Sequence, residues 1–186
     1  LPFLFTSSGQ VFDGLKLEYH ENDKPNPQNV YGKQKVEAEE FINKHYPKSI
    51  ICRVPVMFGQ PSPTSQNFAN NWINSWKKGE SINAFYDEYR SFLSGIKAAE
   101  ALLILLKKGA EGIFHVGGKE MMNCVEFAKK LAEIMEISNP KIIEKSQNEV
   151  KMSAYRPPRV VFKSLKIRDL GFELGNLETN IKKAFF

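Results

Sequence analysis

Three side chains near the start of the chain have the types and spacing that hydride chemistry on a carbonyl group requires: Ser8, Tyr31 and Lys35. Residues four apart in a helix lie on one face, so a helix here would point Tyr31 and Lys35 the same way. Free tyrosine titrates near pH ~10, and bringing it to ~7 requires roughly 4 kcal/mol of preference for the phenolate, which a buried cation commonly supplies. Tyr31 would then exchange a proton with a carbonyl or alcohol oxygen, and Ser8 would donate a hydrogen bond to it.

The Tyr31 and Lys35 pair also has a simpler interpretation as a solvated pair on an exposed helix face. Lysine follows a tyrosine at this spacing by chance about one time in ten. The context favours chemistry, because the hydroxyl run Thr6-Ser-Ser8 ends an apolar segment and the loop Asn26-Pro-Gln-Asn29 supplies a proline and a capping residue before the expected helix.

The elements that must position these side chains alternate in type along the chain. The patterns predict a strand over 3–7, a helix over 30–45 and a second strand over 49–54. This alternation is typical of a parallel α/β sheet, and the nearly all-apolar run 49–54 indicates a central strand covered on both faces. Further on, they predict a proline- and serine-rich loop over 61–65, helices over 68–78, 95–108 and 123–137, strands near 81–86, 112–116, 141–145 and 160–163, and helical segments near 164–170 and 176–184.

The composition bounds the size and class of the protein. A chain of 186 residues with 42% hydrophobic side chains can form one domain or a large part of one. The longest apolar stretch, within 98–106, is interrupted by Glu100 and too short to span a bilayer, and the opening residues lack a signal-peptide pattern. Cys52 and Cys124 fall in apolar strand and helix patterns, which predicts reduced thiols and a cytoplasmic protein without a membrane partner.

The charges and histidines argue against two further kinds of site. The net charge of +5 comes from scattered basic residues, of which the pairs Lys77-Lys78 and Lys107-Lys108 precede glycines at expected helix ends. A nucleic-acid partner is therefore not expected, whereas an anionic small substrate would account for some of the remaining charge. The histidines lie far apart and have no companion cysteines or carboxylates at ligand spacing, so no metal is assigned.

Taken in order, several motifs resemble those of the extended short-chain dehydrogenase/reductase family, and within it the dTDP-4-dehydrorhamnose reductase-like branch. Each motif is common alone, but together in the family's order they are specific, and they span nearly the whole chain. The segments that carry the resemblance are Thr6-Ser-Ser8 with Val11-Phe-Asp-Gly14, Pro27-Gln-Asn-Val-Tyr-Gly-Lys-Gln-Lys35 with Glu39, Arg53-Val-Pro-Val-Met-Phe-Gly59, Asp87-Glu-Tyr-Arg90, Gly112-Ile-Phe-His-Val-Gly-Gly118 and Ala154-Tyr-Arg-Pro157.

This resemblance implies an α/β fold, with a Rossmann-like parallel sheet and a small C-terminal α/β substrate lobe, and an NAD or NADP cofactor. Ser8 matches the family's catalytic serine or threonine and also a substrate contact. Tyr31 matches its proton donor, and Lys35 matches the lysine that holds the nicotinamide ribose and assists the tyrosine. The positions that match the family's cofactor contacts are Thr6, Tyr31, Lys35, Val54, Pro55 and Val56.

Other matching positions concern the substrate. Arg90 falls where related enzymes hold a substrate's nucleotide phosphates, and a structural ion pair is an equally good interpretation of this residue. Three departures from the branch leave the sugar open. Gly9-Gln10 stands where rhamnose-pathway reductases carry Asp-Tyr, Val56 replaces a tryptophan, and Phe92-Leu93 replaces Pro-Thr.

The resemblance also implies a division of the chain. Residues 1–118 match the C-terminal part of an NAD(P)-binding Rossmann domain with a substrate-lobe insertion near 60–93, and residues 119–186 match mainly the substrate-binding lobe. The opening strand matches a middle strand of the family's sheet, so the first βαβ unit, whose glycine-rich loop cradles the cofactor pyrophosphate, is missing from this sequence. A fragment of a longer protein is expected, and the choice between NAD and NADP is set in the missing unit.

The implied function is reduction of a 4-keto nucleotide sugar, with a hydride from the nicotinamide and a proton from Tyr31, and the resemblance allows a homodimer. Two alternatives stay open. One is a nucleotide-sugar epimerase or dehydratase that uses tightly held NAD. The other is a non-catalytic binding protein like a methionine adenosyltransferase regulatory subunit, which resembles the chain in Arg53-Val-Pro-Val-Met-Phe-Gly59.

Overall fold

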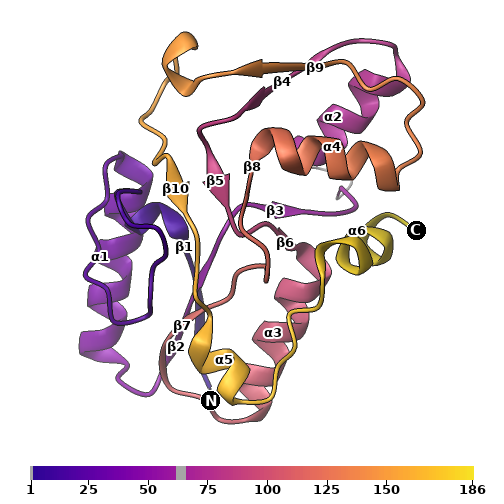
Figure 1. Ribbon diagram of the computed structural model, residues 1–186. Helices are drawn as coiled ribbons and strands as arrows, with labels where there is room; N and C mark the ends of the chain where they lie inside the picture. Colours follow the sequence, from indigo (N-terminus) through magenta and orange to yellow (C-terminus); the bar gives the residue numbers. More distant parts are fainter. Residues whose placement is uncertain (1, 62–65) are drawn as a thin grey trace.

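The structure, a computed structural model, describes residues 2–61 and 66–186 (Figure 1). The loop predicted over 61–65 lies, apart from Pro61, outside the described residues. The strands are β1 (Leu4–Ser8), β2 (Ile50–Val54), β3 (Met57–Phe58), β4 (Ile82–Phe85), β5 (Tyr89–Arg90), β6 (Leu93–Ser94), β7 (Gly112–His115), β8 (Met122–Asn123), β9 (Ile142–Lys145) and β10 (Arg159–Val160). The helices are α1 (Val30–His45), α2 (Phe68–Lys77), α3 (Gly95–Lys107), α4 (Cys124–Ile134), α5 (Leu165–Asp169) and α6 (Leu177–Phe185), with 3-10 turns at Gly9–Val11 and Gln147–Glu149.

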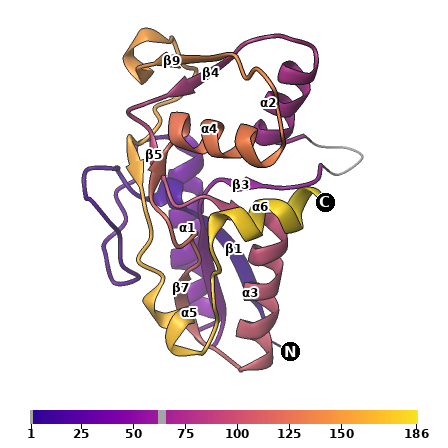
Figure 2. The same ribbon diagram turned by 45° about the vertical axis from the view of Figure 1, so that its right-hand side comes forward.

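A three-stranded parallel sheet in the order β1-β2-β7 forms the centre of one half of the molecule. Every residue of β2 is buried, because α1 packs on the side of β1 while α3 packs against β2 (Figures 1 and 2). The α/β class and the central position of the strand predicted over 49–54 are therefore confirmed. β1 and β2 end together, with Ser8 paired to Val54, and ligands of parallel α/β sheets bind beyond such carboxyl ends.

Helix α1 begins and ends at the residues that the sequence pattern predicted, 30 and 45. Asn29 caps it, because the side-chain oxygen accepts a hydrogen bond of 2.8 Å from the Gly32 N–H. A Cβ atom on Gly32 would overlap the carbonyl oxygen of Gln10, so only glycine lets the first turn lie this close to the segment after β1. This close approach places Tyr31 beside the end of the sheet.

The second half of the molecule is a lobe with an aromatic core. Phe127 of α4 is fully buried and stacks on Phe92 with ring centroids 4.1 Å apart, and Phe58 and Phe68 lie within 5.5 Å of Phe127. The aromatic side chains of α2 pack into this core, because they repeat at helical spacing on one face. Strands β4 and β9 pair in parallel at the far end of the lobe, and β5 lies between β10 and β8 (Figure 1).

Most predicted boundaries agree with the structure to within one residue, and two differ by more. The helix predicted over 123–137 ends at Ile134, because the Ile137 N–H turns back to the Ala132 carbonyl and Glu136 takes a positive φ of 53°, as in a Schellman turn. The strand predicted over 160–163 is shorter, since β10 ends at Val160 and is followed by a single bridge between Tyr19 and Phe162.

The segment after β10 returns to the sheet. Ile167 of α5, Phe172 and Leu174 pack against Phe114 and α3 in the hydrophobic core beneath the sheet, while α6 packs in the core of the lobe. Residues 165–174 thus contact the sheet, although they fall within the predicted lobe, and the division at 118–119 stays a prediction. No helix among residues 2–61 and 66–186 is long and apolar enough to cross a membrane.

Candidate active site

Two adjoining hollows open beyond the carboxyl ends of β1 and β2. The first has a volume of about 240 Å³ and the second about 450 Å³. They share Gln10 and Arg156 in their walls, so they form neighbouring parts of one cleft between the sheet and the lobe. The first is lined by Ser8, Gly9, Gln10, Pro55, Val56, Glu88, Arg90, Arg156 and Val160, and the second by Gln10, Asn29, Val30, Tyr31, Met152, Ser153, Ala154, Tyr155 and Arg156.

Tyr31 and Lys35 lie on the same face of α1, at the open edge of the sheet. The Lys35 ammonium is 5.7 Å from the centroid of the Tyr31 ring and 4.7 Å from that of Phe5. It donates a hydrogen bond of 2.9 Å to the Thr6 carbonyl oxygen, which fixes its position along β1. Tyr31 is 51% exposed, and its hydroxyl makes no hydrogen bond to a described residue. A substrate oxygen can therefore approach this hydroxyl without displacing a protein contact.

Ser8 lies at the end of β1 in the first hollow. Its side-chain oxygen accepts a hydrogen bond of 3.2 Å from the Gln10 N–H and so caps the 3-10 turn Gly9–Val11. Because a hydroxyl can accept and donate at once, the Ser8 proton stays available for an oxygen in the cleft. The structure therefore places the Ser8 and Tyr31 hydroxyls in adjoining hollows on the two sides of Gln10, and the second hollow also has Ser153 and Tyr155 in its wall.

Asn29 connects the segments that form the second hollow, although the sequence suggested only a capping role for it. Its side-chain nitrogen donates to the Gln10 side-chain oxygen at 2.9 Å and to the Tyr155 carbonyl at 3.0 Å. The second contact links the start of α1 to a segment 126 residues later, which no local sequence signal could indicate. Tyr155 and Arg156 stood in a recognised motif, but the sequence offered no role for either.

Arg90 has the structural ion pair that was one of its two interpretations. Its side chain is 4% exposed and lies 2.9 Å from a Glu88 carboxylate oxygen. It also donates hydrogen bonds to the carbonyls of Tyr89, Pro157 and Pro158 at 2.7 to 3.3 Å. These contacts occupy much of the guanidinium, so a substrate contact by Arg90 stays a prediction.

The Arg156 side chain is more exposed and has fewer contacts than that of Arg90. It is 52% exposed, and its one ion pair within the described part of the chain, to Glu88, is long at 3.4 Å. It lines both hollows of the cleft and a third of about 200 Å³ beside them. Arg156 is therefore the arginine of this cleft that can turn towards an anionic ligand.

The predicted cofactor contacts are spread over the edge of the cleft. Pro55 and Val56 line the first hollow, and Val56 is 37% exposed. Thr6 is exposed, and its carbonyl oxygen accepts the hydrogen bond from the Lys35 ammonium. The Val54 side chain, in contrast, is buried in the core beneath the sheet. The cofactor roles of these residues stay predictions. The described residues contain no group of three or more histidine, cysteine or acidic side chains that could hold a metal.

A buried polar network lies behind the cleft and joins α1 to all strands of the sheet. Glu39 of α1 accepts hydrogen bonds from Ser7 of β1 at 2.5 Å and from Arg53 of β2 at 2.6 and 2.9 Å. Arg53 in turn approaches the Nε2 atom of His115 of β7 at 3.4 Å, and the Nδ1 atom of His115 is 3.2 Å from the Tyr19 carbonyl. Because a guanidinium only donates and a carbonyl only accepts, the neutral imidazole carries its proton on Nδ1.

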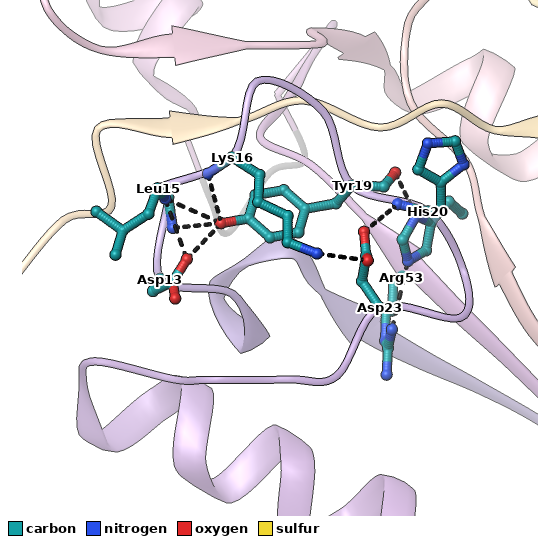
Figure 3. Close-up of polar contacts among 9 residues, drawn as sticks. Asp13, Leu15, Lys16, Tyr19, His20, Asp23 and Arg53 are labelled. Carbon is teal, nitrogen blue, oxygen red and sulfur yellow. Dashed lines mark hydrogen bonds and ion pairs between the residues drawn. The ribbon is translucent and has the colours of Figure 1, made fainter.

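The loop between β1 and α1 is held by the Tyr19 hydroxyl. It donates to Asp13 at 2.5 Å and accepts from the N–H groups of Gly14, Leu15 and Lys16, as Figure 3 shows in part. Burial and the Asp13 contact raise the pKa of Tyr19. The hydrogen bonds that Asp13 accepts from Tyr19, the Leu15 N–H and Asn26 lower its pKa, although burial acts in the opposite direction.

Sequence and structure comparisons relate the chain to known proteins. It is 26% identical to methionine adenosyltransferase 2 subunit beta of Danio rerio over 92% of the chain, and 28% identical to a probable low-salt glycan biosynthesis reductase of Haloferax volcanii over 94%. It spans only 55% and 58% of these two relatives.

Among solved structures, the fold matches a dTDP-4-dehydrorhamnose reductase of Bacillus anthracis in complex with NADP. The TM-score is 0.90 and the identity 24%, over 98% of this chain and 64% of that one. A hypothetical dTDP-4-dehydrorhamnose reductase of Sulfolobus tokodaii is 31% identical with a TM-score of 0.76, over 90% of this chain and 57% of that one. Residues 1–185 match the family described as the RmlD substrate binding domain. The chain thus belongs to this family, a branch of the extended short-chain dehydrogenases/reductases.

Proposed function

We propose that this chain carries the proton-transfer and substrate-binding part of an NAD(P)-dependent reductase that acts on the 4-keto group of a nucleotide sugar. The observation that carries the proposal is that Ser8 and Tyr31 line adjoining hollows beyond the carboxyl ends of parallel strands, with the Lys35 ammonium 5.7 Å from the centroid of the Tyr31 ring. The family match and the reductases among the relatives support it.

The residues at the sheet edge fit a nicotinamide cofactor. Lys35 uses one of its three N–H donors on the Thr6 carbonyl, which leaves two for ribose hydroxyls, and Tyr31 lies beside it. Pro55 and Val56 would contact the nicotinamide ring. When bound, the nicotinamide supplies the hydride that reduces the sugar carbon. The Bacillus anthracis neighbour is in complex with NADP, which supports a nicotinamide dinucleotide, NADP or NAD, as the cofactor here.

The protein's own residues would supply the proton and hold the carbonyl oxygen. Tyr31 would transfer its hydroxyl proton to this oxygen as the hydride reaches carbon, so that the ketone becomes an alcohol. The Ser8 hydroxyl would donate a hydrogen bond to the same oxygen while negative charge develops on it. The Lys35 ammonium would stabilise the tyrosinate that remains, because opposite charges at this range favour the ionised form.

Arg156 would bind the diphosphate of the nucleotide sugar. We expect Arg156→Gln to raise KM for the nucleotide sugar about 10- to 100-fold, the loss of one or two charge-assisted hydrogen bonds of about 1.5–3 kcal/mol, with little change in kcat. Arg159→Gln is the matched control, because Arg159 stacks on Tyr89 at 4.7 Å and lines a separate hollow. Steady-state kinetics that give both variants the same KM would exclude this role of Arg156.

The test of the function is a cofactor-consumption assay with the intact protein. Purified protein is incubated with NADPH or NADH and dTDP-4-dehydrorhamnose, and both cofactor and sugar are measured. Oxidation of one cofactor per sugar reduced supports the proposal. Interconversion of sugars such as UDP-glucose with bound NAD and no net consumption would indicate the epimerase or dehydratase alternative. Absence of any turnover would contradict both.

A second candidate is a non-catalytic subunit of a methionine adenosyltransferase. It is favoured by the similarity to methionine adenosyltransferase 2 subunit beta of Danio rerio, which extends over 92% of the chain. Stable copurification with a methionine adenosyltransferase, together with no sugar turnover in the assay above, would select this candidate. Turnover that depends on Tyr31 would exclude a purely non-catalytic role.

A further inference from the structure

We propose that Glu39 is a positioning residue, which fixes α1 against β1 and β2 so that the hydroxyls of Tyr31 and Ser8 can reach one substrate oxygen. The inference rests on the proposed function for its kinetic consequence, although the placement itself is independent of it. Glu39 lies outside the cleft and touches neither hollow. Its effect on the reaction would therefore be transmitted through α1.

The contacts of α1 with β1 come from one stripe of the helix. Tyr31, Lys35 and Glu39 follow each other at intervals of four residues, on successive turns of the same face. Lys35 binds the Thr6 carbonyl and Glu39 binds the Ser7 hydroxyl. Neighbouring residues of β1 are thus tied to the two turns that follow Tyr31, immediately before the strand ends at Ser8.

The Glu39 contact is the one that restricts the orientation of the helix. Its two oxygens bind the Nε and Nη2 atoms of Arg53 at 2.9 and 2.6 Å, which is a bidentate arrangement. Both side chains are nearly inaccessible, with 2% and 3% exposed. Arg53 is held in turn by β2, the His115 ring and a contact of 5.1 Å with the ring of Phe12. Rotation or sliding of α1 would break this geometry.

Stability alone does not account for such a pair. A buried ion pair is often no more stabilising than apolar side chains of the same volume, and its better supported use is to select one arrangement among several. Tyr31 needs that selection, because it is half exposed and its hydroxyl makes no hydrogen bond to a described residue. Its position therefore follows that of α1.

The geometry of α1 provides a readout that a loss of packing alone would not give. Glu39 faces Ser7 and Arg53 and, beyond Arg53, the neutral His115. Tyr31 lies eight residues before Glu39, about 12 Å along the helix at about 1.5 Å per residue, so a tilt or slide of α1 would displace the Tyr31 hydroxyl. A displaced proton donor lowers kcat while the binding of the substrate, and with it KM, changes little.

The experiment compares Glu39→Gln with Ile42→Ala in the intact protein. Ile42 is also buried on α1 but belongs to no polar network, so its truncation loosens the same helix without altering charge. For Glu39→Gln we expect kcat to fall about 10- to 100-fold with KM within about twofold, since a small misplacement of a reacting group is costly. We expect Ile42→Ala to lower the melting temperature comparably while keeping kcat within about threefold.

A fall in kcat in Glu39→Gln alone, with KM kept, supports the proposal, and equal kcat losses in both variants would overturn it. Amide hydrogen exchange of α1 is the readout that needs no turnover: it should rise over the first turns of the helix in Glu39→Gln, and in Ile42→Ala only around Ile42. Wild-type protein without turnover would refute the reductase function, while the exchange comparison still decides the inference. If Glu39→Gln does not fold, Ser7→Ala takes its place: it keeps the ion pair, and kcat should fall about three- to tenfold, whereas an unchanged kcat would overturn the proposal.

Discussion

Replacement of Tyr31 by phenylalanine is expected to lower kcat at least ~100-fold, and up to ~10,000-fold, while the protein stays folded and KM changes little. The substitution removes only the hydroxyl, which would protonate the carbonyl oxygen. The fold should tolerate this loss, because Tyr31 is 51% exposed and its hydroxyl makes no hydrogen bond to a described residue. The measurement is single-turnover oxidation of the reduced cofactor with a 4-keto nucleotide sugar, alongside thermal unfolding.

Tyr155→Phe is the matched control for this experiment. Tyr155 lines the same hollow as Tyr31, is 49% exposed, and contributes its backbone carbonyl, not its hydroxyl, to the contact with Asn29. We expect Tyr155→Phe to keep kcat within about threefold. If it were the inactive variant and Tyr31→Phe the active one, the proton donor would be Tyr155, and the assignment from the Tyr31 and Lys35 spacing would be wrong.

The elements that local sequence controls were predictable. Helix α1 matched the prediction because Asn29 at its start and the basic residues at its end act within one turn, and such signals are written in neighbouring residues. The central strand β2 was predictable because burial on both faces leaves an apolar run. The end of α4 was placed three residues too late, because its Schellman turn uses Glu136 at positive φ, where glycine usually signals the turn.

The contacts that complete the candidate site were not predictable, because they join residues far apart in the chain. Glu39 and Arg53 stood in motifs that carry the family resemblance, but the sequence offered no role for either, and only the fold brings them together with His115 in the core. Arg90 was compatible with a phosphate contact or an ion pair, and proximity to Glu88 decided its local contacts. The spacing of Tyr31 and Lys35 was informative because residues four apart in a helix lie on the same face, whereas the same spacing in a loop fixes no relative position.

The same network leads to the second large effect, a loss of stability in mild acid that originates in His115. Burial, and to a smaller extent the neighbouring Arg53 guanidinium, lowers the pKa of His115 to about 3 from its ordinary value of 6.5. Between these two pH values the unfolded chain binds a proton that the native protein does not. The free energy of unfolding should therefore be unaffected by His115 above about pH 6.5 and decrease by about 1.4 kcal/mol per pH unit as the pH falls below it.

The window between pH 6.5 and 4.5 isolates this contribution, because Asp13 and Asp23 have pKa values below 3.8 in the native protein and affect stability at lower pH. Denaturant unfolding across the window should show a loss of about 2 kcal/mol in the wild-type protein. His115→Asn should be less stable at pH 7, since it loses the contact with Arg53, but its stability should change much less towards pH 4.5.

His20→Asn provides the control, because His20 is exposed and takes part in hydrogen bonds to described residues through its backbone N–H and carbonyl, not through its ring. This variant should follow the wild-type pH dependence. Parallel stability curves for His115→Asn and the wild type would contradict the prediction and mean that the native protein can protonate the buried imidazole. Arg53 would then have to move away from His115, and since Arg53 also holds Glu39, acid would loosen the attachment of α1 and Tyr31 to the sheet before the protein unfolds.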